Sequence, residues 1–278
     1  MRNEGVIEFA KAHACGNDFL IVDAAQVEGR DLGRLAREMC ARTTGIGGDG
    51  MEYLIKHSER EGAIHLYNAD GTAAELSGNG TRCVAAWMAH RAGLRAGDAV
   101  RLETGAGLRV CKLEAVNGAE FQFTTAMGVP RVTRRQVKLD LKLNGGVTVD
   151  AANVDMGNPQ LIVMVRDEEF AVAGRPWQEV GAAICTHSDF PAGTNVEFVR
   201  RLEDDRIEIR IYERGVGPTS SSGTGTSASA AAMMALEGAP RRLRVLAPGG
   251  EQIVEWPDEQ FELRLTGPAV VLAQGQWL

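Results

Sequence analysis

One segment of this chain occurs twice, and the repeat limits the folds that the chain can adopt. Residues 67–87 read YNADGTAAELSGNGTRCVAAW, and residues 212–232 read YERGVGPTSSSGTGTSASAAA. Ser77 and Ser222 hold equivalent places in the two copies, 222 − 77 = 145 residues apart. Solenoid proteins have much shorter repeats, of roughly 20–50 residues. The repeat therefore predicts two similar halves.

In each copy a Ser-Gly-x-Gly sequence precedes a segment of small and apolar residues that predicts a helix. We expect these helices from about residue 81 past 87 and over residues 227–236. First-turn N–H groups have no partner within a helix, and glycines leave them uncovered, so a carboxylate or phosphate can dock there. Ser77 and Ser222 have a simpler alternative role as helix caps. Two equivalent helix N-termini suit a reaction that needs one group on each face of a carbon.

The remaining elements follow from alternation and apolar runs. Further helices are expected over residues 31–41, with Asp31 as the cap, and over 177–184. A domain crossover is expected near residues 127–131, and residues 269–272 are expected to return to the first domain. Strands are predicted over residues 6–9, 19–22, 51–55, 63–67, 100–103, 108–113, 120–124, 145–156, 161–165, 193–199 and 206–212.

Composition argues against several classes of partner. The net charge of −7, without a long basic run, argues against nucleic acid or an anionic membrane. No apolar stretch reaches the roughly 18 residues of a membrane span, and the N-terminal sequence lacks a signal-peptide core. The five cysteines are scattered without a Cys-x-x-Cys pair, which favours reduced thiols and a cytoplasmic protein.

Two possible cofactor signals are weak. Residues 43–50 contain four glycines, as a phosphate-binding loop does, but no Lys-Ser/Thr follows them. The five histidines are scattered and show no metal-ligand spacing. We therefore expect neither a metal nor an organic cofactor.

A series of short motifs runs along the chain in the order GNDF, GIGGDG, YNADG, SGNGTRC, GNP, GTNVEF, YERG and SGTG. In these motifs and their spacing the chain resembles the diaminopimelate epimerase family over essentially its full length. The resemblance implies an α/β (α+β) fold of two pseudo-symmetric domains, each a mixed, mostly antiparallel sheet around a central helix, with the active site in the cleft between them. The implied domains are residues 1–127 with 267–278, and residues 128–266.

The family is a group of cofactor-independent isomerases that interconvert LL- and meso-diaminopimelate, for lysine and cell-wall synthesis. The resemblance thus implies a small amino-acid substrate and no cofactor, and members of the family often form homodimers. Backbone N–H groups of Gly78, Asn79, Gly223 and Thr224 are expected to bind the α-carboxylate. The residues expected to hold the distal ammonium and carboxylate are Asn68, Asn158, Asn195, Glu213 and Arg214. Two further candidates for substrate contact are Asn17, which has an ordinary turn as its alternative role, and Gln160.

This chain departs from the family at the centre of the mechanism. In the family a cysteine begins each motif helix, and the two thiols move protons on opposite faces of the α-carbon; here the positions hold Ser77 and Ser222. A thiol can be poised as thiolate at a helix N-terminus, whereas a serine hydroxyl needs a neighbour to take its proton. The sequence identifies no such neighbour. The family's histidine after Asn-Pro is Gln160 here, which is not a base.

Three hypotheses follow. The first is an epimerase of this family, weakly active or inactive because both thiols are replaced; Gln160 argues against a purely engineered replacement. The second is a divergent member whose serines catalyse another isomerisation, or a dehydration, of an amino acid. The third is a non-catalytic amino-acid-binding protein in which Ser77 and Ser222 are caps alone. The distal residues favour diaminopimelate or a close diamino dicarboxylate under all three.

Overall fold

A computed structural model describes residues 5–139 and 147–278. Its contacts divide the chain into two compact units, Met1–Thr125 with Gly267–Leu278 and Ala126–Thr266. Residues 145 and 146, which belong to the strand expected over 145–156, lie outside the described residues. Each unit is described by itself below.

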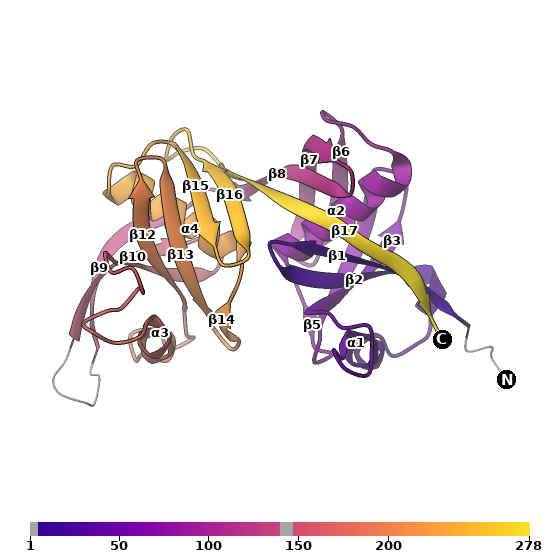
Figure 1. Ribbon diagram of the computed structural model, residues 1–278, viewed down its shortest axis with the longest axis horizontal. Coiled ribbons are helices and arrows are strands. Elements are labelled where there is room, and N and C mark those ends of the chain that lie inside the picture. The colour runs from indigo at the N-terminus through magenta and orange to yellow at the C-terminus, as the bar shows by residue number, and fades with distance from the viewer. Residues whose placement is uncertain (1–4, 140–146) are drawn as a thin grey trace. The chain divides into compact units, whose positions relative to one another are not determined.

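The first unit is a sheet that encloses one helix, α2 (Figure 1). Going across the sheet, β17 pairs antiparallel with β1, β1 antiparallel with β2, β2 parallel with β3, and β3 antiparallel with β4. Then β4 pairs parallel with β6, β6 antiparallel with β7, and β7 antiparallel with β8. Pairing of β8 with β17 closes this sheet. The elements are β1 (Ile7–Ala14), β2 (Asn17–Asp23), the 3-10 helix η1 (Ala24–Val27), α1 (Leu32–Cys40), β3 (Gly50–Lys56), β4 (Glu61–Asn68), β5 (Ala73–Ala74), α2 (Gly78–Ala92), β6 (Ala99–Thr104), β7 (Gly107–Asn117), β8 (Glu120–Gly128) and β17 (Leu263–Trp277).

The second unit repeats this arrangement. β9 pairs antiparallel with β10, β10 antiparallel with β11, β11 parallel with β12, and β12 antiparallel with β13. β13 pairs parallel with β15, β15 antiparallel with β16, and β16 antiparallel with the first part of β17. The elements are β9 (Arg131–Leu139), β10 (Val147–Asp155), β11 (Pro159–Met164), α3 (Trp177–Cys185), β12 (Asn195–Glu203), β13 (Arg206–Glu213), β14 (Gly217–Thr219), α4 (Gly223–Leu236), β15 (Arg242–Ala247) and β16 (Gly250–Glu255).

Strand directions therefore follow the same order in both units, which confirms the duplication that the repeat predicts. The register agrees as well. Met51 pairs with Tyr67 in the first unit, and Val196 pairs with Tyr212, each 145 residues further on, in the second.

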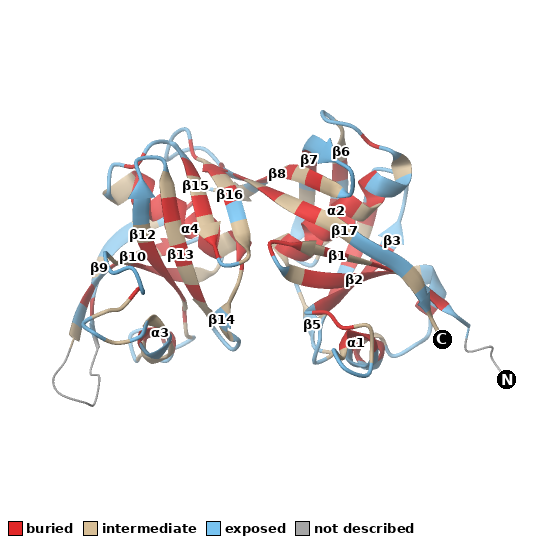
Figure 2. Ribbon diagram, viewed as in Figure 1, coloured by how far each residue is buried: buried red, intermediate tan, exposed pale blue. Residues whose placement is uncertain are grey.

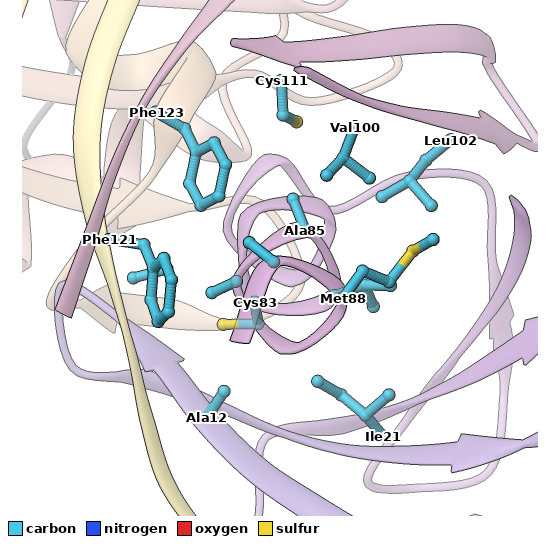
Figure 3. Packing of buried hydrophobic residues seen from close by; sticks show 14 of the residues in the cluster. Ala12, Ile21, Cys83, Ala85, Met88, Val100, Leu102, Cys111, Phe121 and Phe123 are labelled. Atoms are coloured by element: carbon cyan, nitrogen blue, oxygen red, sulfur yellow. The ribbon is translucent and has the colours of Figure 1, made fainter. Parts of the chain in front are cut away.

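The central helices are buried on all sides because their residues are small or apolar around the whole circumference. Around α2, Ala85 and Met88 pack against Val100 and Leu102 on one side and against Phe123 on another (Figure 3). Around α4, a run of alanines and Met233 packs against strand residues such as Ile209. Both helices are buried along most of their length in Figure 2.

A second core lies outside each sheet, under an amphipathic helix. Leu35 and Met39 of α1 are buried, and the Asp31 side chain caps this helix by accepting a hydrogen bond from the Arg34 N–H at 3.0 Å. Val180 and Ile184 of α3 are buried in the same way. These helices confirm the predictions for residues 31–41 and 177–184.

The two motif helices begin earlier than expected, at Gly78 rather than near residue 81 and at Gly223 rather than 227. Glycine has a low helix propensity, so the Gly-rich turns were expected to stay outside the helices. A serine cap holds the first turn of each helix instead: Ser77 Oγ accepts from the Gly80 N–H at 3.0 Å, and Ser222 Oγ accepts from the Gly225 N–H at 3.2 Å. Across the described ranges, none of the helices is long and apolar enough to cross a membrane.

Candidate active site

The first half-site is the start of α2, where Ser77, Gly78 and Asn79 lie. Ser77 is partly exposed, and its hydroxyl oxygen is engaged in the cap. A Cβ placed on Gly78 would meet no atom within 4 Å, so there is open space beside the first turn. The N–H groups of a first helical turn and the positive end of the helix dipole favour a negative ligand at such a place. Asn79 itself is buried.

Asn17 and Asn79 lie together in this unit and are joined by hydrogen bonds. Asn79 Nδ2 donates to Asn17 Oδ1 at 3.2 Å, and Asn17 Nδ2 donates to Asp49 Oδ2 at 2.7 Å. Arg42 Nη2 in turn contacts Asp49 Oδ1 at 2.6 Å and Asp18 Oδ1 at 2.8 Å. Burial raises the pKa of Asp18, but the hydrogen bonds from Arg42 and Lys11 outweigh it and lower the pKa to about 2. The loop that carries Asn17 is thus held by an ionised cluster.

The second half-site is the start of α4, where Ser222 is buried, with 7% of its surface exposed. Its hydroxyl oxygen accepts the cap hydrogen bond from Gly225 and lies 3.4 Å from Thr224 Oγ1, and the hydroxyl is close enough to Glu213 to act on the pKa of that carboxyl group. Burial raises the pKa of Glu213, and the hydrogen bond from Ser222 partly opposes this rise. Glu213 is therefore a candidate to take a proton from Ser222, a neighbour that the sequence alone did not identify.

The two half-sites differ at the position that Glu213 holds. Its counterpart in the repeat is Asn68, 145 residues earlier, at the end of β4. Asn68 is exposed, and its Nδ2 donates to Thr72 Oγ1 at 3.0 Å. An amide cannot take a proton as a carboxylate does, so Ser77 lacks at this position the partner that Ser222 has.

Gln160 is fully buried in the second unit, and the protein engages its side-chain amide. In one orientation Nε2 donates to Glu197 Oε1 at 2.8 Å, and Oε1 accepts from Thr224 Oγ1 at 3.1 Å and from Asn195 Nδ2 at 3.2 Å. In the reverse orientation Nε2 would donate to Asn158 Oδ1 at 2.9 Å, but the amide oxygen would face the Glu197 carboxyl group. We adopt the first orientation because it pairs every donor with an acceptor.

Other expected substrate residues of the second unit gather around Gln160 and Glu213. Asn195 Oδ1 accepts from the Arg214 backbone N–H at 2.9 Å, which ties the end of β13 to the start of β12. The Arg214 side chain is exposed, and its Nη1 donates to the Ala192 carbonyl oxygen at 2.6 Å. The structure thus brings Asn158, Gln160, Asn195, Glu213, Arg214, Ser222, Gly223 and Thr224 into one region of the second unit.

A pair of buried glutamates was missed by the sequence analysis. Glu52 and Glu197 are both completely buried and are related by the same offset of 197 − 52 = 145 residues. Each lies against the second glycine of a motif: a Cβ on Gly80 would overlap Glu52 Oε1, and one on Gly225 would lie 2.5 Å from Glu197 Oε1. A charged residue repeated at this offset inside an apolar strand was the signal that could have identified them.

Burial controls the ionisation of both carboxyl groups. It raises the pKa of Glu52 to about 8, and neither oxygen of Glu52 has a hydrogen-bond partner. Burial and repulsion from Glu213 raise the pKa of Glu197 well above its usual range. The second half-site therefore holds two carboxyl groups whose pKa values are both raised, that of Glu197 the more strongly, and such perturbed pairs are typical of catalytic sites.

Replacing Glu52 by glutamine should make the protein's stability less dependent on pH. In the unfolded chain Glu52 ionises near 4.5, but in the fold only near 8. As the pH rises between these values the unfolded state loses the proton first, so the stability contributed by Glu52 is full below 4.5 and is lost by about 8. Relative to Glu52→Gln, the native protein should lose roughly 2–5 kcal/mol of unfolding free energy between about pH 5 and pH 9.

Urea unfolding of both proteins across this range measures the difference. The exposed Glu59 provides the control, because Glu59→Gln should run parallel to the native protein. A constant gap between Glu52→Gln and the native protein at all pH values would contradict the assignment.

The glycine-rich segment 43–50 is not a phosphate-binding loop in this structure. Its N–H groups bind carbonyl oxygens at the end of α1: the N–H groups of Ile46 and Gly47 donate to Met39 at 2.8 and 3.0 Å, and that of Gly48 donates to Cys40 at 3.1 Å. These donors cap the helix and are not available to a phosphate. Within residues 5–139 and 147–278, no three His, Cys, Asp or Glu side chains are grouped to hold a metal ion. All five cysteines are buried, and none is joined in a disulfide.

Comparison with known proteins agrees with this arrangement. The family model described as diaminopimelate epimerase matches residues 9–133 and 152–272. The chain is 36% identical to a diaminopimelate epimerase of Desulforudis audaxviator, over 98% of this chain and 99% of that protein. It is 33% identical to one of Pelotomaculum thermopropionicum, with the same coverage. A solved PhzF-family phenazine biosynthesis protein of Bacillus anthracis has the same fold, with a TM-score of 0.71, 16% identity and 99% coverage of both chains. The chain therefore belongs to the diaminopimelate epimerase family, a family of isomerases.

Proposed function

We propose that this protein is a cofactor-independent amino-acid epimerase of the diaminopimelate type, with low turnover because serines replace both cysteines. The observation that carries the proposal is the position of Glu213 beside Ser222, whose hydroxyl lowers the pKa of the Glu213 carboxyl group. It gives one serine the neighbouring base that a hydroxyl needs in order to act on a carbon acid. The buried free thiols fit a reducing, cytoplasmic setting.

Proton transfer at the second half-site would proceed as a relay. Ser222 Oγ takes the α-proton of the amino acid while its own proton passes to Glu213, and the electron pair of the C–H bond remains on the substrate. The substrate carboxylate, bound at a helix N-terminus, stabilises that charge through the first-turn N–H groups. By analogy with the family, the Ser77 hydroxyl returns a proton to the opposite face.

Turnover should be low for two reasons. A serine hydroxyl is a far weaker acid than a thiol, so the relay starts from a poorer base than a thiolate. Gln160 stands where the family has a histidine, and its amide is bound to Glu197 and Thr224 rather than free to move protons.

A second candidate is a one-sided isomerisation of a related diamino acid. The observation that favours it is the difference between Glu213 and Asn68, because only Ser222 has the carboxylate at this position of the repeat. Such an enzyme would remove the α-proton from one stereoisomer through Ser222 and Glu213 and deliver it from the same side to another atom of the substrate.

Replacing Glu213 by glutamine should reduce α-proton exchange by roughly 100-fold or more, because general base catalysis by one side chain contributes about 10²–10⁴-fold. Glutamine keeps the shape of the side chain and can accept the Ser222 hydrogen bond, but it cannot hold the proton. Exchange measured in heavy water provides the test, with the surface variant Glu59→Gln as control. Equal rates in Glu213→Gln and the native protein would remove Glu213 from the mechanism.

The substrate class is tested by binding. Calorimetric titration with LL- and meso-diaminopimelate should give saturable binding, and lysine, which lacks the distal carboxylate, should bind more weakly. Binding without any exchange would favour the non-catalytic homologue. Failure of both diaminopimelate isomers to bind would refute the proposed substrate.

A further inference from the structure

Arg82 is a buried cation without a carboxylate partner. It lies in the second turn of α2 and is 2% exposed, and its Nε has no hydrogen-bond partner. Cys15, Cys83 and Cys111 lie near it, and burial raises the pKa of the Cys83 and Cys111 thiols, which keeps these two uncharged. Burial lowers the pKa of the guanidinium, but an arginine remains charged at neutral pH. A buried charge without a counter-charge is costly, so its retention calls for a role.

Arg82 is the first member of a chain of hydrogen bonds that runs along the first half-site. Its Nη2 donates to Asn79 Oδ1 at 2.5 Å, Asn79 Nδ2 donates to Asn17 Oδ1 at 3.2 Å, and Asn17 Nδ2 donates to Asp49 Oδ2 at 2.7 Å. At the far end Asp49 is held by Arg42 at 2.6 Å.

The two ends of this chain fix the direction of both amides. A guanidinium only donates hydrogen bonds, so the Asn79 oxygen must face Arg82 and its nitrogen must face Asn17. An ionised carboxylate only accepts, so the Asn17 nitrogen must face Asp49. Arg82 and Asp49 therefore impose the same orientation from opposite ends, and neither amide can reverse without placing donor against donor or oxygen against oxygen.

We propose that Arg82 is a positioning residue for the first half-site. It holds the side-chain amides there in the orientation that presents N–H donors to a substrate carboxylate. Asn17, which is partly exposed, carries a second hydrogen on the nitrogen that faces Asp49. The start of α2 adds first-turn N–H groups beside the open space at Gly78. The buried charge of Arg82 adds a positive potential that no carboxylate of the described residues neutralises at ion-pair distance. A bound carboxylate supplies that neutralisation.

The inference deepens the proposed function and rests on it for the identity of the ligand. Arg82→Met removes the charge and the donor while keeping an unbranched side chain of similar length. Replacement of a buried charge by an apolar group is often neutral or stabilising, so this variant should remain folded. Arg91→Met, at an exposed position of the same helix, is the control.

The first measurement needs no ligand. Side-chain amide signals of Asn79 and Asn17 are followed by ¹⁵N NMR in the native protein, Arg82→Met and Arg91→Met. The signals of both asparagines should shift in Arg82→Met, including those of Asn17, which Arg82 does not contact, and neither should shift in Arg91→Met. An unchanged Asn17 signal would overturn the proposed orientation of the chain by Arg82.

The second measurement separates this inference from the proposed function. Calorimetry should show that Arg82→Met binds diaminopimelate at least ~10-fold more weakly than the native protein, since the positive potential of Arg82 and its hold on the two amides are both lost. Binding of the corresponding diamide should change little, and Arg82→Lys should restore part of the affinity for diaminopimelate. If the native protein binds diaminopimelate and Arg82→Met binds it equally well, the inference is wrong. If the native protein does not bind diaminopimelate, the proposed function is wrong. The role of Arg82 in orienting the two amides is then tested by the NMR signals of Asn79 and Asn17 alone.

Discussion

Ser77→Cys/Ser222→Cys should raise the rate of diaminopimelate epimerisation by roughly 100-fold or more, the scale of a well-placed general base. Each serine already caps a helix, through Gly80 and Gly225 respectively, so a thiol at the same position lies at the positive end of the helix dipole. That location lowers the pKa of a thiol and increases its thiolate fraction. Chiral chromatography of LL- and meso-diaminopimelate measures the rate.

Single variants show which step each position carries. Ser222→Cys alone should exchange the α-proton of one stereoisomer much faster than it interconverts the two, because Ser77 remains the weak proton donor on the opposite face. Ser221→Cys adds a thiol one residue away from the cap and should have no effect. An activity of the double variant that equals that of the native chain would instead support the divergent reaction.

Gly80→Ala should destabilise the protein by roughly 1–3 kcal/mol, the usual cost of overpacking a core. The added Cβ overlaps Glu52 Oε1 and comes within 3.3 Å of Phe19 Cε1. Glu52 is completely buried, so its side chain has no solvent-filled space to move into. Alanine has a higher helix propensity than glycine, so propensity alone predicts that Gly80→Ala stabilises the protein. A measured loss of stability would therefore point to the clash with Glu52.

The neighbouring glycine supplies the control. Gly78→Ala meets no atom within 4 Å and should leave the stability unchanged or slightly higher. In the double variant Gly80→Ala/Glu52→Ala the clash is removed, so the two substitutions should cost less together than the sum of their separate effects. Additive effects in this cycle, measured by urea unfolding, would show that Glu52 does not press against Gly80.

Much of the fold was predictable from the sequence because local patterns and the repeat agree. The 145-residue offset between Ser77 and Ser222 predicts duplicated halves, and both units show the same order of strand pairings. Asp31 was identified as a cap because it precedes an amphipathic segment, and it caps α1. The helices α2 and α4 begin three to four residues earlier than expected, at Gly78 and Gly223, because each serine cap holds a first turn that contains glycines.

Tertiary contacts decided what the sequence left open. Glu52 lies in an apolar strand, where the sequence gives no reason to expect a buried carboxyl group. Its position is seen only in the folded protein, where the side chain packs against Gly80. The contact between Ser222 and Glu213 joins the end of one strand to the start of a helix, and no local pattern encodes it. Arg82 is a polar residue on a helix that is buried all round, so periodicity gave it no role.

The most direct test of the account is proton NMR of diaminopimelate in heavy water with the native chain. The account predicts slow loss of the α-hydrogen signal above a control without protein, and no such loss with Glu213→Gln. That result would establish that Ser222 and Glu213 form a working base. The measurement must run long enough to detect a rate 100-fold below that of Ser77→Cys/Ser222→Cys. If the α-hydrogen signal is then lost equally fast with and without the protein, proton transfer by the serines is contradicted.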